Sequence, residues 1–340
     1  MDAQNVVHEL MEKTEGNYAI FDSITKAYSV LCKHYAIAVS VSGGKDSDVV
    51  VDLISRLDTE KKVKYVWFDT GLEYQATKDH IKYLEERYGI IIDRERAIKS
   101  IPVSCKQYGQ PFLSKMISHI INRAQRYGFK FEDVPYEELI GLYPKSIVRW
   151  WCNSFQPAHS PYNIRRNKWL KEFMILYPPH FMISDRCCDF AKKDVAKQYI
   201  EAHDIDCVIT GIRRSEGGAR SIAYKTCFDA VADGCDRYRP IFWYTNADEK
   251  FYIDLFGVVN SDCYTLWGMN RTGCVGCPYN KNLSTELALI EEHEPQMLTA
   301  VNNVFKDSYE YTRMYRAFCE EMDNKYGSYT QYLSNKTEKD

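Results

Sequence analysis

The hexapeptide SGGKDS at residues 42–47 has the composition of a phosphate-binding loop. It follows the apolar run YAIAVSV and precedes SDVVVDLISRL, which has helical periodicity, so the expected order is strand, loop, helix. Backbone N–H groups at the start of a helix bind anions, and glycine lets the backbone approach a phosphate closely. The loop lacks the GxxxxGK(S/T) spacing, which argues against a kinase-like or GTPase-like site. The residues assigned to phosphate binding are Ser42, Gly43, Gly44, Lys45, Asp46 and Ser47.

Two cysteine pairs have a spacing that suits a metal or an iron–sulfur cluster. Cys187 and Cys188 are adjacent, and Cys274 and Cys277 form a CxxC pair. Four thiolates can bind either tetrahedral zinc or a [4Fe–4S] cluster. Structural zinc usually has ligands two to four residues apart, and buried thiols without any metal are a third interpretation.

Segments with the apolar pattern of buried strands alternate with helical segments. The expected strands lie at 35–41, 63–69, 89–95, 180–184 and 206–211. This alternation predicts an α/β fold in which a Rossmann-like parallel sheet carries helices on both faces. The expected organisation is a helical lead-in at 1–34, an α/β domain at 35–240 with a helical insertion at about 100–175, a helical C-terminal region with the CxxC at 241–330, and a frayed tail at 331–340.

The composition is that of an ordinary folded protein. With 45% hydrophobic and 27% charged residues and a net charge of −3, the chain shows neither the signature of disorder nor an overall basic bias. Its longest apolar runs are shorter than the roughly 20 residues that a membrane helix needs, and its first residues do not form a signal peptide. Twelve cysteines in 340 residues are too few for a disulfide scaffold. We therefore expect a cytoplasmic protein without a membrane partner.

SGGKDS resembles the signature of the PP-loop ATP pyrophosphatase superfamily, whose members have an adenine nucleotide alpha hydrolase-like (HUP-type) fold. Two further segments resemble the phosphoadenosine phosphosulfate (PAPS) reductase family, namely FDTGLE at 68–73 and TGIRRSE at 210–216. The resemblance spans roughly residues 35–280 and implies that the chain binds ATP or an adenylyl sulfate. Arginine offers planar donors that suit phosphate and sulfate. The additional nucleotide-binding residues that it implies are Asp69, Thr70, Gly71, Gly211, Arg213, Arg214 and Arg220.

The cysteine pattern resembles the iron–sulfur adenylylsulfate reductases of this family, in which an adjacent pair is followed at long range by a CxxC. The resemblance implies a [4Fe–4S] cluster on the four paired cysteines, with zinc as the less favoured alternative. In the DNA-phosphorothioation sulfurtransferases of the same family, the cluster cysteines lie toward the C-terminal side. Cys263 is therefore the main alternative ligand, and Cys235 is a second one.

The family's reductases use a cysteine in a C-terminal ECGxH-like motif, whereas this sequence ends in YGSYTQYLSNKTEKD. The hypothesis is therefore an ATP-dependent sulfurtransferase, in which an acceptor oxygen attacks the α-phosphorus, pyrophosphate leaves and a sulfur nucleophile displaces AMP. Asp46 and Asp69 would hold Mg²⁺, and Lys45 and Arg213 would stabilise the developing charge. One alternative is an adenylylsulfate or PAPS reductase with a nonstandard thiol. Another is a non-catalytic nucleotide-binding partner in a defence or mobile-element system.

The acceptor and the sulfur donor are less clearly indicated. Basic residues alternate with aromatic ones in the insertion, which suits either single-stranded nucleic acid or an aromatic helical core. Cys152 is either a sulfur-carrying thiol or a structural one. The expected partners are an adenine nucleotide, a cysteine desulfurase or thioredoxin-like protein, a nucleic acid acceptor and a second copy of the chain. The alternating residues are Arg123, Arg126, Lys145, Arg149, Arg165, Arg166 and Lys168 with Tyr127, Tyr143, Trp150, Trp151, Tyr162 and Trp169.

Overall fold

The computed structural model describes residues 3–14, 16–217, 223–232 and 234–332. The chain divides into two units. The first comprises Met1–Ile101, Cys188–Val275 and Glu292–Glu294, and the second comprises Pro102–Cys187, Gly276–Glu291 and Pro295–Asp340. Both units are therefore built from segments that lie far apart in the sequence.

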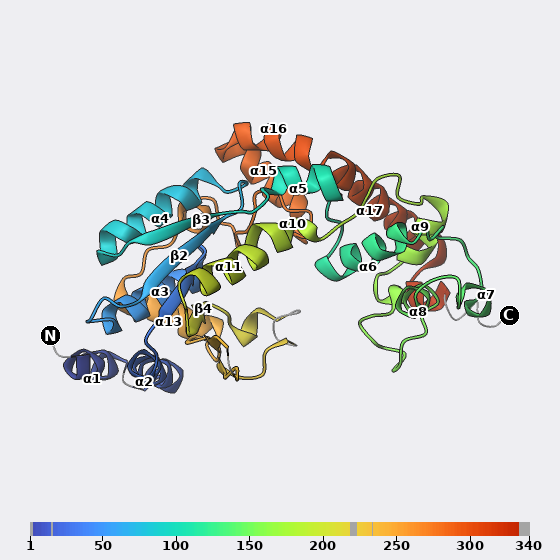
Figure 1. Cartoon of the computed structure of the whole chain (residues 1–340). Coiled ribbons are helices and arrows are strands. Elements are labelled where there is room, and N and C mark those ends of the chain that lie inside the picture. The colour runs from blue at the N-terminus through green and yellow to red at the C-terminus, as the bar shows by residue number, and fades with distance from the viewer. Residues whose placement is uncertain (1–2, 15, 218–222, 233, 333–340) are drawn as a thin grey trace. The chain divides into compact units, whose positions relative to one another are not determined.

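A six-stranded sheet forms the centre of the first unit, with the strand order β3-β2-β1-β4-β6-β5. Figure 1 labels β2, β3 and β4 of this sheet. Neighbouring strands are parallel except for β5 and β6, which are antiparallel. The carboxyl ends of β1, β2 and β4 therefore lie at the same edge of the sheet. The strands are β1 (Ile37–Val41), β2 (Lys64–Asp69), β3 (Ile92–Arg96), β4 (Cys207–Thr210), β5 (Phe228–Asp229) and β6 (Asp236–Tyr238).

The helices of the first unit are α1 (Ala3–Lys13), α2 (Tyr18–Lys33), α3 (Lys45–Leu57), α4 (Gln75–Tyr88), η2 (Asp189–Lys193), α11 (Asp194–Ala202), η3 (Arg214–Glu216), α13 (Asn246–Phe256) and α14 (Asp262–Thr265). The second unit is mainly helical and contains α5 (Ile101–Tyr108), α6 (Lys115–Arg126), α7 (Tyr136–Leu139), α8 (Lys145–Trp151), η1 (Ile164–Arg166), α9 (Leu170–Leu176), α10 (Arg186–Cys188), α15 (Leu283–His293), α16 (Pro295–Val304) and α17 (Lys306–Tyr326). None of the helices in the described part of the chain is long and apolar enough to span a membrane.

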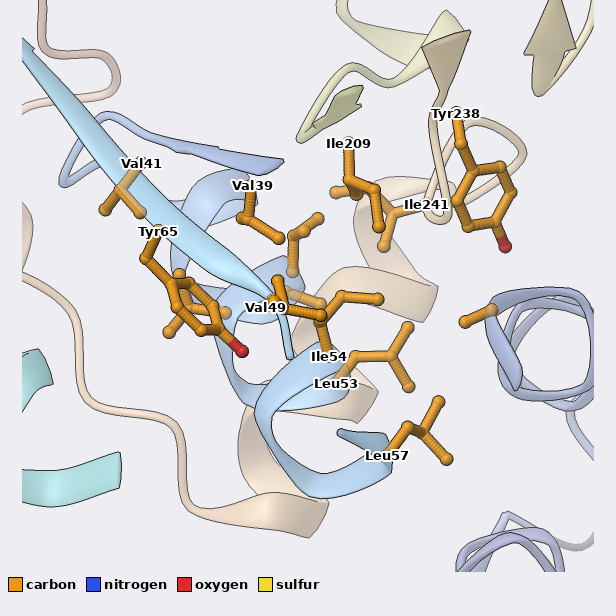
Figure 2. Packing of buried hydrophobic residues seen from close by; sticks show 14 of the residues in the cluster. Val39, Val41, Val49, Leu53, Ile54, Leu57, Tyr65, Ile209, Tyr238 and Ile241 are labelled. Carbon is orange, nitrogen blue, oxygen red and sulfur yellow. The ribbon is translucent and has the colours of Figure 1, made fainter. Parts of the chain in front are cut away.

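Helices cover both faces of the sheet. Val39 of β1 belongs to the same buried cluster as Leu53 of α3, and Figure 2 shows these side chains packed together. Helices α2, α4 and α13 contribute to the same cluster. The neighbouring residue Ala38 faces the other way and packs with Tyr199 of α11, because side chains alternate between the two faces of a strand. A strand buried on both faces reads as a continuous apolar run, as YAIAVSV does. The predicted α/β fold with a Rossmann-like parallel sheet is confirmed.

An aromatic core holds the second unit together. Trp150 and Trp151 of α8 are buried in it, and so is Trp169 immediately before α9. The ring centroids of Phe173 in α9 and Tyr311 in α17 are 4.9 Å apart, so the two helices share this core. The three tryptophans therefore pack helices and are not exposed for stacking with nucleic acid.

The prediction of a strand at 180–184 is wrong. Ile183 makes only an isolated bridge with Gln110 and is buried in the second unit. A short apolar run has the same appearance whether it enters a sheet or packs against helices. The sheet is completed instead by β6 and β5, whose short sequences have no recognisable apolar pattern.

Candidate functional site

Three of the predicted segments meet at the carboxyl edge of the sheet. Strand β1 pairs with β2 on one side and with β4 on the other, so the chain connections diverge at β1. In open parallel sheets, ligands bind outside the carboxyl ends of the strands at such a switch point. The segments at this edge are 42–47, which includes the first residues of α3, 69–71, which begins at the last residue of β2, and 211–214, which ends at the first residue of η3.

The first loop has the backbone geometry of an anion site. Gly43 has a φ of 67°, and a side chain at this position would lie 2.9 Å from Thr77 Cγ2. The Ser42 N–H donates to Ser47 Oγ at 2.9 Å, which closes the loop. Gly44 is the N-cap of α3 and has no side chain to accept the first N–H groups of the helix. These N–H groups suit the phosphates of a ligand.

Gly211 lets strand β4 approach the start of α3. A Cβ at this residue would lie 2.8 Å from the Asp46 carbonyl oxygen and 3.0 Å from the Ser47 nitrogen. Backbone atoms cannot move aside as flexible side chains do, so a glycine is required here.

Arg213 connects two carboxylates at this edge. It is buried, with 7% of its surface exposed, and its Nε donates to Asp46 Oδ1. Its Nη2 lies 2.9 Å from Glu249 Oε2, and its Nη1 donates to Asn246 Oδ1 at 2.9 Å. Arg213 therefore positions Asp46 and Glu249, and most of its donors are used within the protein.

The pKa of Asp46 is raised above its ordinary value of 3.8. Burial is the main cause, and the nearby Glu249 carboxylate adds to it, whereas Glu216 and the Arg213 charge lower the pKa. Glu249 Oε1 is buried and has no hydrogen-bond partner in the described part of the chain. Asp46 and Glu249 together thus present more negative charge than Arg213 neutralises, which suits a divalent cation.

The side chains after β2 are largely engaged within the first unit. Asp69 accepts a hydrogen bond from the Gly71 N–H at 2.9 Å and another from Arg94 Nε at 2.9 Å. The Thr70 hydroxyl donates to Glu73 at 2.6 Å, and both residues are buried. Gly71 has a φ of 77°, which favours glycine in this turn. These contacts fix the loop and leave Asp69 less available to a ligand than Asp46.

Arg214 and Arg220 were predicted to bind the nucleotide with Arg213. The Arg214 side chain is exposed, and its guanidinium lies 5.5 Å from the centroid of the Trp243 ring. Arg220 lies outside the described residues.

Sequence reasoning missed Glu249 and Tyr264. The Lys45 Nζ lies 5.0 Å from the centroid of the Tyr264 ring, and the Tyr264 hydroxyl is 2.6 Å from Thr272 Oγ1. Burial raises the pKa of Tyr264 to about 12, so the hydroxyl stays neutral. Among 26 tyrosines, nothing in the sequence distinguishes this one.

Cys188 and Cys274 belong to the first unit, and Cys187 and Cys277 belong to the second. The pKa of Cys274 is raised to about 11, chiefly by burial and further by Glu73 and Cys188, while Lys192 and Thr70 lower it. The Val275 N–H donates to the Leu72 carbonyl at 3.1 Å, which holds this cysteine beside the loop that follows β2.

A buried glutamate supports the other half of the CxxC segment. In the second unit, the Gly276 N–H donates to Glu286 Oε1 at 3.2 Å, and Tyr309 donates to the Gly276 carbonyl. Within the described residues, no group of three or more His, Cys, Asp or Glu side chains is arranged to hold a metal ion.

Four of the other cysteines are placed less suitably for chemistry. Cys235 immediately precedes β6, at the amino edge of the sheet, where Asp236 pairs with the first residue of β4. This edge is opposite to the candidate site. Burial raises the pKa of Cys263 to about 11, and it also raises the pKa values of Cys152 and Cys319. These three thiols are therefore weak nucleophiles at neutral pH.

The model of the phosphoadenosine phosphosulfate reductase domain matches residues 36–122 and 156–280, more than half of the chain. The chain belongs to this family. The uncharacterized protein MJ0973 of Methanocaldococcus jannaschii is 24% identical over 323 residues, which cover 93% of this chain and 60% of that protein. The chain thus spans about 60% of the length of this relative.

Two solved structures have a distant overall similarity to this chain. The PAPS reductase of Candida auris has a TM-score of 0.44 and 13% identity, with 79% of this chain and 93% of that chain covered. The U34-tRNA thiolase NcsA of Methanococcus maripaludis, solved with its [4Fe-4S] cluster, has a TM-score of 0.37 and 13% identity, with 93% and 80% covered. Neither similarity is close enough to assign a ligand to this chain.

Gly211→Ala should weaken ATP binding at least tenfold and lower the melting temperature. The added methyl group must displace the first turn of α3, and overpacking of this kind costs about 1–3 kcal/mol. Calorimetric titration with ATP and thermal unfolding measure the two effects. Gly273→Ala is the matched control, because a Cβ there has no atom within 4 Å. Equal ATP affinity in the two variants would show that the close approach at Gly211 is unimportant for the site.

The affinity for Mg²⁺–ATP should increase with pH as Asp46 ionises. The raised pKa means that protonated Asp46 persists above pH 3.8, and only the ionised carboxylate binds a cation. Glu249→Gln removes a neighbour that raises this pKa, so the midpoint should move to lower pH. Titrations with ATP from pH 4 to 8 measure the midpoint. The same titrations of Asp46→Asn measure the pH dependence that comes from protonation of ATP itself. An unchanged midpoint in Glu249→Gln would contradict the assignment.

Proposed function

We propose that the chain is an ATP-dependent, adenylating sulfurtransferase of the PAPS reductase domain family. The observation that carries this proposal is the position of loop 42–47 at the switch point between β1 and β4, where the start of α3, Lys45 and Asp46 come together. This arrangement suits a bound nucleotide whose phosphates lie over the loop. The family match supports an adenine nucleotide as the ligand.

The proposed reaction has two steps. An oxygen of the acceptor attacks the α-phosphorus of ATP, the bond to the β-phosphate breaks, and pyrophosphate leaves. A sulfur nucleophile then attacks the adenylated carbon or phosphorus of the acceptor, and AMP leaves with the oxygen. The loop N–H groups and Lys45 stabilise the charge that develops on the phosphates. Arg213 acts through Asp46, whose carboxylate it orients.

Mg²⁺ fits the oxygen donors beside the loop. Asp46 has a second carboxylate oxygen beyond the one that Arg213 binds. Glu249 Oε1, which has no hydrogen-bond partner among the described residues, belongs to the same network. We assign Asp46 as the main ligand and Glu249 as its neighbour. Asp69 remains a candidate, although Arg94 and the Gly71 N–H bind its oxygens.

Four cysteines are the proposed ligands of a [4Fe–4S] cluster. Within the first unit, Cys188 and Cys274 are the assigned ligands. Burial raises the pKa of Cys274, and the Lys192 charge opposes that rise and so favours the thiolate form that binds iron. Cys187 and Cys277 are assigned from the sequence alone. When bound, such a cluster would hold the sulfur that is transferred. Zinc on the same four cysteines is the alternative.

A reductase that acts on PAPS or adenylyl sulfate is the second candidate, and the family match favours it. That reaction needs a reactive thiol to attack sulfur. Cys319 lies in α17, and burial raises the pKa of its thiol, so it is a weak nucleophile. We therefore prefer the ATP-dependent reaction.

Pyrophosphate release from ATP tests the proposed activity. The assay contains sodium sulfide and a single-stranded RNA or DNA oligonucleotide as the acceptor probe. Lys45→Ala should slow release at least about 100-fold, because a charge-stabilising group is lost, whereas Lys82→Ala on the exposed surface of α4 should not. Sulfite release from PAPS with thioredoxin and without ATP would instead establish the reductase. ATP binding without turnover would favour the non-catalytic partner.

The iron and acid-labile sulfide content of the anaerobically purified chain tests the cluster. We expect about four irons and four sulfides per chain. Cys188→Ser and Cys274→Ser should each lose most of the iron, while Cys32→Ser, which changes an exposed thiol, should keep it. Zinc without sulfide would rule out the cluster and leave the adenylation proposal standing.

A further inference from the structure

Helix α6 of the second unit carries a basic hollow on its solvent-facing side. His119, Arg123, Arg126 and Tyr127 line this hollow, which has a volume of about 410 Å³. Their spacing places them on one face of the helix. The opposite face, with Ile117 and Ile121, is fully buried in the core of the second unit.

The positive charge of the two arginines is not neutralised locally. Neither Arg123 nor Arg126 forms a side-chain hydrogen bond or ion pair with any residue that the structure describes. Lys171 of the same unit, by contrast, lies 2.7 Å from Asp133. His119, which lines the hollow, has its Nδ1 3.4 Å from Asp185 Oδ1.

Arginines in the last turn of a helix also interact favourably with the helix dipole. That effect accounts for the positive charge. It does not account for the hollow, nor for Tyr127, whose side chain is 59% exposed beside the arginines. An exposed aromatic ring beside unpaired cations is the combination that binds single-stranded nucleic acid, because bases stack on the ring and phosphates contact the cations.

The dimensions favour a chain of phosphates over a single anion. His119 and Arg126 are seven positions apart, which is about 10 Å along a helix. A second hollow of about 560 Å³ begins at Gln125 and Gly128 and includes Lys130 and His180 among its lining residues. The lining of this second hollow also includes Glu132, so the basic surface is that of the first hollow.

We propose that this face of α6 binds the backbone of single-stranded nucleic acid, with Arg123 and Arg126 on phosphates and Tyr127 stacked on a base. The binding needs neither ATP nor a cluster, so it stands or falls independently of the proposed reaction. The arginines are two of the residues that the sequence associates with nucleic acid, whereas the buried tryptophans of the same pattern are not part of this surface.

Fluorescence anisotropy with labelled twelve-nucleotide oligo(dT) and oligo(U) tests the proposal on the full chain without ATP. Replacing both arginines (Arg123→Gln with Arg126→Gln) should weaken binding at least tenfold. The plot of log K against log salt should become shallower by about 1.4, because each phosphate contact to a single strand contributes about 0.7. Tyr127→Ala should weaken binding without changing this slope. The two oligonucleotides show whether DNA or RNA is preferred.

The matched control is Arg313→Gln with Lys281→Gln, which removes the same charge from exposed positions in the second unit. This control should bind as the unmodified chain does. Melting temperatures of all variants separate lost binding from lost stability, since a role confined to the helix dipole would lower stability and leave binding equal to the control. Equal binding by the arginine variant and the control would overturn the proposal. So would a surface that binds 10 mM inorganic phosphate but neither oligonucleotide.

Discussion

The contact between Gly211 and the first turn of α3 is the constraint on which the site depends. With any larger residue at the end of β4, the carbonyl of Asp46 could not lie so close to this strand. The contact places Arg213, two residues further on, beside the Asp46 carboxylate, and α13 supplies Glu249 to the same guanidinium. The parallel sheet thus brings the ends of β1 and β4 to the same edge. Gly211 lets the start of α3 lie close to β4, and Arg213 orients the Asp46 carboxylate. The proposed phosphate binding by the loop depends on all three, because the N–H groups at the start of α3 can act together only if that turn is held in place.

Local signals in the sequence made the fold class predictable, and they also singled out loop 42–47 of the candidate site. The loop 42–47 could be recognised because apolar residues, two glycines and a helical pattern follow one another within a few residues. Glu249 and Tyr264 could not be predicted, because they reach the loop only through tertiary packing and their sequence surroundings are unremarkable. The apolar segment at 180–184 predicted a strand for the same reason that β1 did, but it packs among helices. The tryptophans of the insertion were equally ambiguous, since sequence alone does not distinguish an exposed stacking surface from an aromatic core.

The surroundings of the cysteines in the structure distinguish their chemical roles better than their spacing in the sequence does. Cys274 is partly buried, and the charges of Lys192, Glu73 and Cys188 act on its thiol. Cys152, Cys263 and Cys319 have pKa values raised by burial, and Cys235 lies at the opposite edge of the sheet. An attacking thiol of the kind that the family's reductases use is therefore not provided by these four residues. This placement is the physical reason to prefer a reaction that starts with ATP, in which the chain's own contribution is to bind and orient phosphates.

The most direct test is a crystal structure of the protein with a non-hydrolysable ATP analogue and Mg²⁺. We expect the phosphates within hydrogen-bonding distance of the backbone N–H groups of residues 43–47, and the cation on the Asp46 carboxylate. A nucleotide bound elsewhere, or phosphates that do not contact this loop, would contradict the assignment of the site and the adenylation reaction built on it.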